Sequence, residues 1–266
     1  MSETSAEHTI YGIYRDCLRH EDPVALVTVI NGPDVGAKLL VRPGHDPVGT
    51  LGDADLDRVV ARDALAELEA GATEVRHYGP HGEARMDDVA VFIESRAPRA
   101  QMLIFGAVDF TRALADQGKL LGFRVTVCDA REVFATELRF PMADEVVVDW
   151  PHRLIERAAD RLGPRDAICV LTHDNKFDVP AIVAALATDV GYIGAMGSRR
   201  THAKRVEKLR EAGVTDDQLL RVKAPIGLDI GARTPEETAV SVVAEIISNR
   251  TGHRAASLSE TSGPIH

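Results

Sequence analysis

Residues 102–130 read MLIFGAVDFTRALADQGKLLGFRVTVCDA, and this stretch indicates most clearly how the chain folds. It holds two short apolar runs, MLIFGA and RVTVCDA, separated by a segment with the periodicity of an amphipathic helix. Three more apolar runs follow, EVVVDW at 145–150, AICVLTHD at 167–174 and VGYIGAMG at 190–197. Continuous apolar strands that alternate with helices indicate a parallel sheet covered on both faces. Residues 102–250 are therefore predicted to form a Rossmann-type, doubly wound α/β domain.

The segment before this domain has a different pattern of predicted helices and strands. Residues 9–20 and 53–71 have helical periodicity, the second ending at Gly71. Residues 24–30, 37–52 and 73–95 read as strands with turns rich in Pro and Gly. We therefore expect a smaller α+β domain at 1–95, a linker at 96–101, where Pro98 disfavours helix, and a polar, disordered tail at 251–266.

Composition excludes several classes of protein. The 266-residue chain has a formal net charge of -10, which argues against nonspecific nucleic-acid binding. The same charge gives no reason to expect binding to an anionic membrane. No apolar stretch approaches the roughly 20 residues of a membrane span, and residues 1–10 lack the features of a signal peptide. Cys17, Cys128 and Cys169 lie far apart and predict free thiols in the cytoplasm. His77 and His81 share a short turn without helper ligands, so we expect surface residues and no metal site.

Polar residues and glycines gather where the predicted parallel strands end. Ligands of such sheets bind outside the carboxyl ends of the strands, so these residues predict a binding crevice. The candidates, in chain order after successive strands, are Gly106, Ala107, Val108 and Asp109; Asp129 and Arg131; Thr172, His173 and Asp174; Gly194, Gly197, Ser198, Arg199, Arg200 and Thr201; and Gly227, Asp229 and Gly231.

The first of these loops only partly fits a dinucleotide fingerprint. In G-x-G-x-x-G/A, the second glycine lets the backbone approach a pyrophosphate, and here Val108 stands in that position and Thr111 in the third. Asp129 follows about 20 residues after Gly106, where a ribose-binding carboxylate belongs. NAD or NADP binding therefore stays an alternative.

The segment GSRRTHAKR at 197–205 predicts an anion site. Ser198 or Thr201 can cap the helix that follows, and a helix start offers free N–H groups and the positive end of a dipole. Arg199 and Arg200 add forked donors that suit phosphate or carboxylate. The alternative is a solvated basic stripe, which we expect for Lys204 and Lys208.

Two further candidates keep two interpretations each. His173 and Asp174 could do acid–base work at the end of a strand, or could hydrogen-bond neighbouring loops. Near Gly227, Asp229 and Gly231, we expect backbone in unusual conformations along the crevice. The next residues are structural: Thr234 and Glu237 predict a capping box at the start of a helix.

Two long motifs resemble a known family. YIGAMGSRRTHAKRVEKL at 192–209 and APIGLDIGARTPEETAVSVVAEII at 224–247 closely resemble the XdhC/CoxI family of accessory proteins, which mature molybdenum hydroxylases such as xanthine dehydrogenase. FRVTVCDAREVFA at 123–135, LTHDNKFDVPAIVAAL at 171–186, VGAKLLV at 35–41 and VGTLGDADLD at 48–57 also fit this family.

The resemblance implies a ligand and a partner. The ligand would be the molybdenum cofactor, a phosphorylated pterin carrying a metal, bound between the two domains and delivered to an apo molybdenum hydroxylase. Ser198, Arg199 and Arg200 would bind its phosphate, and Asp129 a hydroxyl or pterin edge. The centre of the site would be lined by Thr172, His173 and Asp174. A homodimer is also implied.

The chain departs from the family pattern at two places. Family members usually carry a run of glycines and a cysteine, with an acid two positions on. Here Asp53 lies in the corresponding stretch, Asp55 replaces the cysteine and Asp57 keeps the acid. A carboxylate is a hard ligand and cannot carry sulfur. The usual Gly-Ala-Gly-His loop reads Gly-Ala-Val-Asp at 106–109.

These departures predict a divergent accessory protein. It would bind an anionic cofactor, either the molybdenum cofactor or a nucleotide, with little or no catalysis. The alternatives are an NAD(P)-dependent oxidoreductase and a non-catalytic nucleotide-binding regulator. The missing cysteine favours the regulator over a complete molybdenum chaperone.

Overall fold

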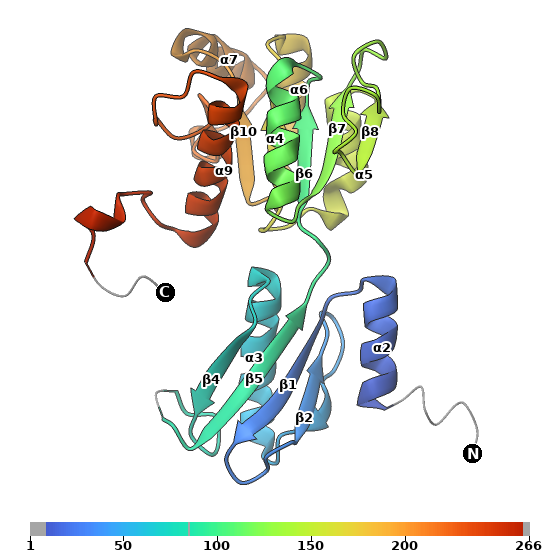
Figure 1. Ribbon diagram of the computed structural model, residues 1–266, viewed down its shortest axis with the longest axis vertical. Coiled ribbons are helices and arrows are strands. Elements are labelled where there is room, and N and C mark those ends of the chain that lie inside the picture. The colour runs from blue at the N-terminus through green and yellow to red at the C-terminus, as the bar shows by residue number, and fades with distance from the viewer. Residues whose placement is uncertain (1–8, 85, 263–266) are drawn as a thin grey trace. The chain divides into compact units, whose positions relative to one another are not determined.

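The computed structural model describes residues 9–84 and 86–262, and the chain divides into two compact units, Met1–Pro98 and Arg99–His266. Each unit has its own sheet (Figure 1). The chain start at residues 1–8 and the end of the predicted tail at 263–266 lie outside the described residues. Within the described ranges, no helix is both long and apolar enough to cross a membrane.

The N-terminal unit is an antiparallel sheet with two helices. The strand order is β3-β2-β1-β5-β4. The elements are α2 (Ile10–His20), β1 (Val24–Asn31), β2 (Lys38–Val41), β3 (Val48–Thr50), α3 (Ala54–Ala70), β4 (Glu74–Tyr78) and β5 (Val89–Arg96). Helix α3 ends, as predicted, at Gly71, which has the left-handed conformation that glycine adopts without strain.

Side-chain alternation along β1 builds two apolar layers in this unit. Ala25, Val27 and Val29 pack in one cluster with the buried side of α3, while Val24 lies in the other with Cys17 of α2. Successive side chains of a strand point to opposite faces, so one strand supplies both layers.

The C-terminal unit is a six-stranded parallel sheet with the order β11-β10-β9-β6-β7-β8. The strands are β6 (Gln101–Phe105), β7 (Arg124–Asp129), β8 (Glu145–Val148), β9 (Ala167–Val170), β10 (Tyr192–Ala195) and β11 (Val222–Lys223). The chain runs outward from β6 to one edge and then from β9 to the other, so the strand order reverses between β6 and β9. The predicted doubly wound, Rossmann-type fold is confirmed.

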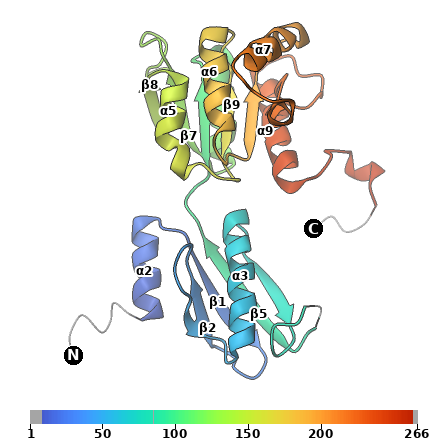
Figure 2. The ribbon, with the colours of Figure 1, turned by 180° about the vertical axis from the view of Figure 1, so that it is seen from behind.

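Helices cover both faces of this sheet. Helices α4 (Asp109–Leu120) and α9 (Pro235–Thr251) pack together on one face (Figure 1). The opposite face carries α5 (Pro151–Ala158), α6 (Asn175–Leu186) and α7 (Arg199–Glu211) (Figure 2). Along β6, Met102 and Ile104 belong to the core under α4 and α9, and Leu103 and Phe105 to the core on the other side. Short helical segments are η1 (Ala159–Arg161), α8 (Asp216–Leu219) and η2 (Leu258–Glu260).

Two local features differ from the pattern that the sequence predicts. The connection from β7 to β8, residues 130–144, contains no helix. Strand β10 continues to Ala195, so Gly194 lies within the strand rather than in the loop after it. It stays in the sheet because it pairs with Cys169 on one side and Lys223 on the other.

Candidate functional site

The ends of β6 and β9 meet where the strand order reverses. Gly106 follows β6 with φ +107°, a conformation that L side chains rarely adopt. A Cβ on Gly106 would lie 2.8 Å from Thr172 Cγ2 and 3.0 Å from the Thr172 nitrogen. The glycine therefore allows the two loops to touch at the edge where sheets of this type bind ligands.

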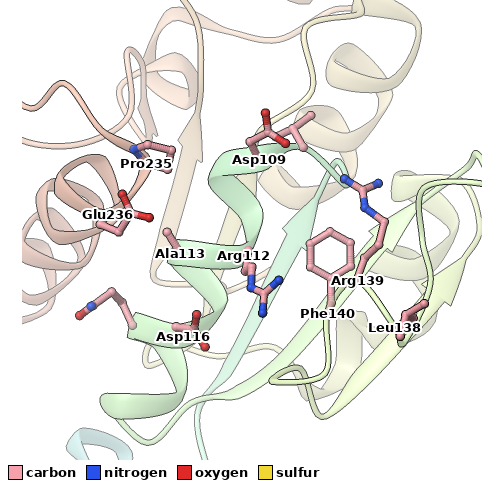
Figure 3. Close-up of a pocket in the computed structure, with 11 residues that line it drawn as sticks. Asp109, Arg112, Ala113, Asp116, Leu138, Arg139, Phe140, Pro235 and Glu236 are labelled. Atoms are coloured by element: carbon pink, nitrogen blue, oxygen red, sulfur yellow. The ribbon is translucent and has the colours of Figure 1, made fainter.

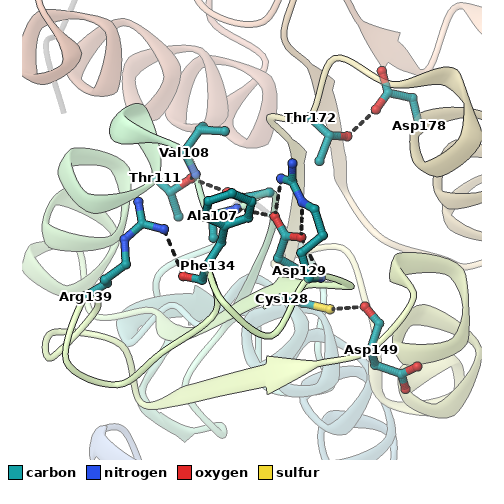
Figure 4. A network of polar contacts seen from close by, with 12 residues as sticks. Ala107, Val108, Thr111, Cys128, Asp129, Phe134, Arg139, Asp149, Thr172 and Asp178 are labelled. Carbon is teal, nitrogen blue, oxygen red and sulfur yellow. Dashed lines mark hydrogen bonds and ion pairs between the residues drawn. The ribbon is translucent and has the colours of Figure 1, made fainter.

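The loop from β6 to α4 is closed by its own chain. The Gly106 N–H donates to a carbonyl of β7 at 2.9 Å, Ala107 N–H to Asp129 Oδ2 at 2.8 Å, and Val108 N–H to Thr111 Oγ1 at 3.3 Å (Figure 4). The Thr111 hydroxyl in turn donates to the Gly106 carbonyl. Three successive N–H groups, the donors that a pyrophosphate uses in dinucleotide-binding proteins, thus already have partners.

Asp129, at the end of β7, holds the loop between β6 and α4. Its side chain is buried; Oδ1 accepts from Arg131 N and Nε, both at 2.9 Å, and Oδ2 from Arg131 Nη2 at 2.8 Å as well as from Ala107. Burial raises the pKa of Asp129, but the hydrogen bonds from Arg131 and Ala107 outweigh it and leave the pKa below its usual value. Both oxygens are engaged, so a ligand hydroxyl would reach Asp129 only by displacing Arg131.

Acidic side chains mark most helix starts in this unit. A carboxylate near a helix N-terminus satisfies the positive end of the dipole and repels a second anion. Helix α7 has no acid in its first turn or directly before its cap, whereas α5, which also has none in its first turn, follows Asp149. The acids at the starts of the other α-helices of this unit are Asp109 in α4, Asp149 before α5, Asp174 and Asp178 at α6, Asp216 and Asp217 in α8, and Glu236 and Glu237 in α9.

Helix α7 presents a basic, capped start. Ser198 is the cap, with its Oγ accepting from Thr201 N at 3.1 Å, which decides between the two predicted caps. Gly197 precedes it with φ +141°. Arg199 and Arg200 are exposed, and within the described part of the chain neither their guanidinium groups nor their N–H groups have a hydrogen-bond partner. Basic donors and the dipole thus act together at one helix start.

Further along α7 the basic residues separate into two kinds. Lys204 and Lys208 are exposed, as expected. Arg205 is fully buried, which we did not predict from the sequence. One signal was available, since Arg205 lies four residues before Leu209 and so shares its buried helix face.

Buried Arg205 pairs with an acid on α6. Its Nη2 lies 2.7 Å from Asp178 Oδ2 and donates to the Met196 carbonyl at 2.8 Å. The other Asp178 oxygen accepts from the Thr172 hydroxyl (Figure 4). Burial raises the pKa of Asp178, while Thr172 and Arg205 act in the opposite direction. The Thr172 hydroxyl, predicted to line the site, is therefore engaged with Asp178.

His173 and Asp174 are both exposed after β9. Asp174 caps α6, with Oδ1 accepting from Lys176 N at 2.9 Å. In the described structure no hydrogen bond joins His173 to Asp174, so the two do not form an assembled acid–base pair. Asp174 thus caps its own helix, a role that neither interpretation predicted, and an acid–base role for His173 stays a prediction.

The loop before α9 has the expected unusual backbone. Gly227 and Gly231 have φ of +96° and +74°, and Asp229 is exposed. A Cβ on Gly227 would lie 2.5 Å from Ser241 Oγ of α9, and the Gly227 N–H donates to Glu245 Oε2 at 2.9 Å. These contacts fasten the loop to α9. The capping box at Thr234 and Glu237 is also confirmed.

Gly194 serves close packing rather than loop geometry. It is buried in β10, and a Cβ there would lie 2.5 Å from Ile226 Cδ1 and 2.8 Å from Tyr192 Cε1. A larger residue would have to displace the loop that crosses the end of β10. The structure therefore gives this candidate binding residue a packing role.

In the N-terminal unit, the stretch that replaces the glycine–cysteine motif starts α3. Asp53 caps the helix, with Oδ1 accepting from the N–H groups of Asp55 and Leu56, both at 3.0 Å. Its Oδ2 lies 2.9 Å from His81 Nδ1. Asp57 accepts from a backbone N–H at 2.7 Å, whereas Asp55 is exposed. Asp55, at the position where the resemblance predicts a cysteine, is thus an exposed carboxylate paired with Arg58.

No accessible thiol compensates for this replacement. The three cysteines of the chain are all buried. Burial raises the pKa of Cys128 to about 12 and also raises that of Cys169, so neither forms a thiolate at neutral pH. Among residues 9–84 and 86–262, no group of three or more His, Cys, Asp or Glu side chains could hold a metal ion.

A groove of about 680 Å³ runs along α4 beside the start of α9 and the β7–β8 connection (Figure 3). Two of the predicted site residues, Val108 and Asp109, line it, whereas no motif in the sequence indicated the other lining residues. Arg112 and Arg139 face it together with Asp109, Asp116 and Glu236. Its carboxylates outnumber its guanidinium groups, so it offers an anion less than the start of α7 does.

Comparison with known proteins shows where the chain is similar. The model of the XdhC Rossmann domain matches residues 102–246, and that of the XdhC and CoxI family matches residues 17–79. A probable xanthine dehydrogenase subunit of Bacillus subtilis (strain 168) is 31% identical over 194 residues, which cover 67% of this chain and 56% of the relative. The molybdenum cofactor insertion chaperone PaoD of Escherichia coli (strain K12) is 36% identical over 93 residues, 35% of this chain and 29% of PaoD.

The chain spans about half the length, or less, of the curated relatives it matches. A crystal structure of a xanthine dehydrogenase from Bacillus halodurans superposes with a TM-score of 0.64 at 22% identity, covering 91% of this chain and 66% of that one. At this identity the likeness supports the fold.

Proposed function

Because this chain belongs to the XdhC and CoxI family, we propose that it is an accessory protein that binds an anionic cofactor for the maturation of a molybdenum hydroxylase. The observation that carries the proposal is the start of α7. There, Ser198 caps a first turn that has no acid and that adds the exposed Arg199 and Arg200. PaoD, a relative by sequence, is a molybdenum cofactor insertion chaperone, which supports the molybdenum cofactor as the cargo.

The chemistry of α7 fits the phosphate of such a cargo. The N–H groups of the first turn and the helix dipole favour a dianion. The guanidinium groups of Arg199 and Arg200 donate in forked pairs that match phosphate oxygens. Each charge-assisted hydrogen bond contributes about 1.5–3 kcal/mol. Binding at this point needs no catalytic group of the protein.

The proposal assigns binding and delivery to this chain, without sulfur transfer. Asp55 cannot carry sulfur, all three cysteines are buried, and burial raises the pKa of the Cys128 and Cys169 thiols. With no cluster of metal-ligating side chains in the described ranges, the contacts we propose are to the organic, anionic part of the cofactor. An apo molybdenum hydroxylase would receive it.

A titration tests this proposal. Molybdopterin, NAD(H), NADP(H) and ATP are titrated by calorimetry into the wild type and into Arg199→Ala/Arg200→Ala. We expect the wild type to bind molybdopterin and the double variant to lose about 2–4 kcal/mol, roughly 30- to 1000-fold in Kd. Lys204→Ala/Lys208→Ala removes two exposed cations from the same helix and should change Kd by less than about threefold. Equal affinities in all three proteins would refute the α7 site.

A nucleotide-binding regulator is the second candidate, favoured by the exposed Asp55 at the cysteine position. Tight ATP binding without pterin binding would support it. The closed loop at Ala107 and Val108 counts against the third alternative, the NAD(P)-dependent oxidoreductase. Tight binding of a dinucleotide with hydride transfer would overturn that argument.

We further propose a cytoplasmic homodimer. The cytoplasmic location is supported by three buried, unpaired cysteines, as expected in a reducing compartment. The dimer follows from likeness to the family. Light scattering of the purified chain measures its mass directly, and a monomer would remove the dimer from the proposal.

A further inference from the structure

One buried ion pair joins the ends of two strands beside the proposed anion site. Arg205 of α7 and Asp178 of α6 have side-chain exposures of 0% and 1%. Arg205 Nη2 and Nε lie 2.7 Å and 3.2 Å from the same oxygen, Asp178 Oδ2. Both side chains are shielded from solvent, so the pair is a fixed connection between the two helices.

The same two side chains reach both strand ends. Arg205 Nη2 donates to the Met196 carbonyl at 2.8 Å, directly after β10, and Asp178 Oδ1 accepts from the hydroxyl of Thr172, the second residue after β9. The turn that begins at Met196 leads through Gly197 into the first turn of α7. One guanidinium therefore fixes the chain just before the N–H groups proposed to bind the anion.

The backbone at Gly197 passes close to this guanidinium. An added Cβ there would lie 3.6 Å from Arg205 Nη2 and 3.1 Å from Thr201 Cγ2. Within the described ranges, Nη1 of Arg205 is buried and has no hydrogen-bond partner. Since Nη1 and Nη2 form one edge of the guanidinium, the free donor lies on the edge that also meets the Met196 carbonyl.

We propose that Arg205 is a positioning residue: it holds the turn at residues 196–200 so that the free N–H groups of α7 face one point, and it ties that turn to the end of β9. A lysine cannot replace it, because a single ammonium lacks the planar fork that reaches Asp178 and Met196 together. The geometric claim stands on the contacts alone. Its consequence for a ligand rests on the proposed function.

The free energy of unfolding distinguishes a positioning role of the ion pair from a purely stabilising one. A buried ion pair replaced by apolar side chains of similar volume often leaves a protein equally stable, since desolvation offsets attraction. Directional hydrogen bonds to Met196 and Thr172 are lost in such a replacement. If the pair only stabilises the fold, Arg205→Met/Asp178→Leu should keep the geometry of α7; if it positions the turn, that geometry should loosen in a folded protein.

The test measures amide exchange and anion binding in the full chain. The amides of Thr201 and His202 are the first bonded ones of α7, donating to Ser198 Oγ and Ser198 O. In Arg205→Met/Asp178→Leu we expect them to exchange about tenfold faster or more, and inorganic pyrophosphate to bind about tenfold more weakly. Arg205→Lys keeps the charge and should show the same two changes to a smaller extent. If the double variant does not fold, Arg205→Lys takes its place in the test.

Asp166→Asn is the matched control. Asp166 is also a buried carboxylate, but it accepts from Gln101 N and Gly163 N at the other end of the parallel strands. We expect Asp166→Asn to lower the overall stability of the protein. It should leave both the exchange rate of the Thr201 amide and the affinity for pyrophosphate unchanged.

The outcomes separate the two proposals. Unchanged exchange at Thr201 and His202 in both Arg205 variants, or the same acceleration in Asp166→Asn, overturns the positioning role. If the wild type does not bind pyrophosphate but exchange is faster in the Arg205 variants, the positioning role is supported and the anion site is overturned. Wild-type binding that both Arg205 variants retain, despite faster exchange, overturns the link between turn geometry and ligand.

Discussion

Asp129 is the carboxylate that the sequence assigned to a ligand and that the structure uses to organise the loop after β6. Replacing it with alanine removes the acceptor for Ala107 N–H and for three donor groups of Arg131. Arg131→Ala is the matched change, because it removes the guanidinium but leaves the carboxylate and both backbone N–H groups in place. The two variants differ in which partner is left unsatisfied.

The expected costs follow from burial. Ala107 is 4% exposed, so its orphaned N–H would cost about 1–3 kcal/mol, and the loss of the second backbone bond brings the total for Asp129→Ala to roughly 2–4 kcal/mol. The Arg131 side chain is 47% exposed, so water can take the place of its guanidinium at the Asp129 carboxylate, which keeps its two backbone donors; Arg131→Ala should therefore cost about 1 kcal/mol. The folded pKa of Asp129 lies below its usual value. Its contribution is therefore complete at neutral pH and is lost as the pH falls below about 4.

Urea unfolding followed by fluorescence measures this difference. The chain has one tryptophan, Trp150, and it lies in the unit that contains Asp129, so the signal reports that unit. We expect Asp129→Ala to unfold at clearly lower urea than Arg131→Ala at pH 7, and the gap to wild type to shrink in acid. Equal costs for the two variants would show that the carboxylate does not hold the loop.

Three further predictions concern single positions. Gly106→Ala should destabilise by about 3 kcal/mol in urea unfolding, because its φ of +107° and the 2.8 Å approach to Thr172 Cγ2 both penalise a Cβ; a cost under about 1 kcal/mol would contradict the close contact. Burial raises the pKa of Asp144, but bonds from Lys119 and a backbone N–H bring it to about 2, so Asp144→Asn should cost about 1–2 kcal/mol at pH 7 and progressively less from pH 5 to pH 2; a cost that does not vary with pH would exclude the ion pair as its cause. Ser198→Ala should cost about 1 kcal/mol by removing the cap of α7, measured by thermal unfolding, and no change would deny the capping bond.

Periodicity and local chemistry made the fold and the helix ends predictable. The apolar runs of β6 and β7 face helices on both sides, so a parallel sheet is the arrangement that buries them. The stop at Gly71, the cap at Ser198 and the capping box at Thr234 depend on neighbours within four residues. The exposure of Lys204 followed from its helix face.

Long-range partners escaped prediction. Arg205 and Asp178 are 27 residues apart, and nothing local in either segment shows that they meet. Asp129 and Ala107 are 22 residues apart and meet only because β6 and β7 are neighbours in the sheet. In both cases, a charged group expected near ligand or solvent is engaged inside the protein.

The order of residues was enough to predict a doubly wound domain with ligand-facing loops at one edge, because side-chain periodicity fixes which surfaces must be buried. Which of those loops still offer donors became visible only in the folded chain. In the folded chain, Asp129 and Thr111 occupy the N–H groups of Ala107 and Val108 before α4, and Asp109 places a carboxylate in the first turn of that helix. The first turn of α7 has no acid and carries the exposed Arg199 and Arg200 instead, so the positive end of its dipole is not offset by a carboxylate.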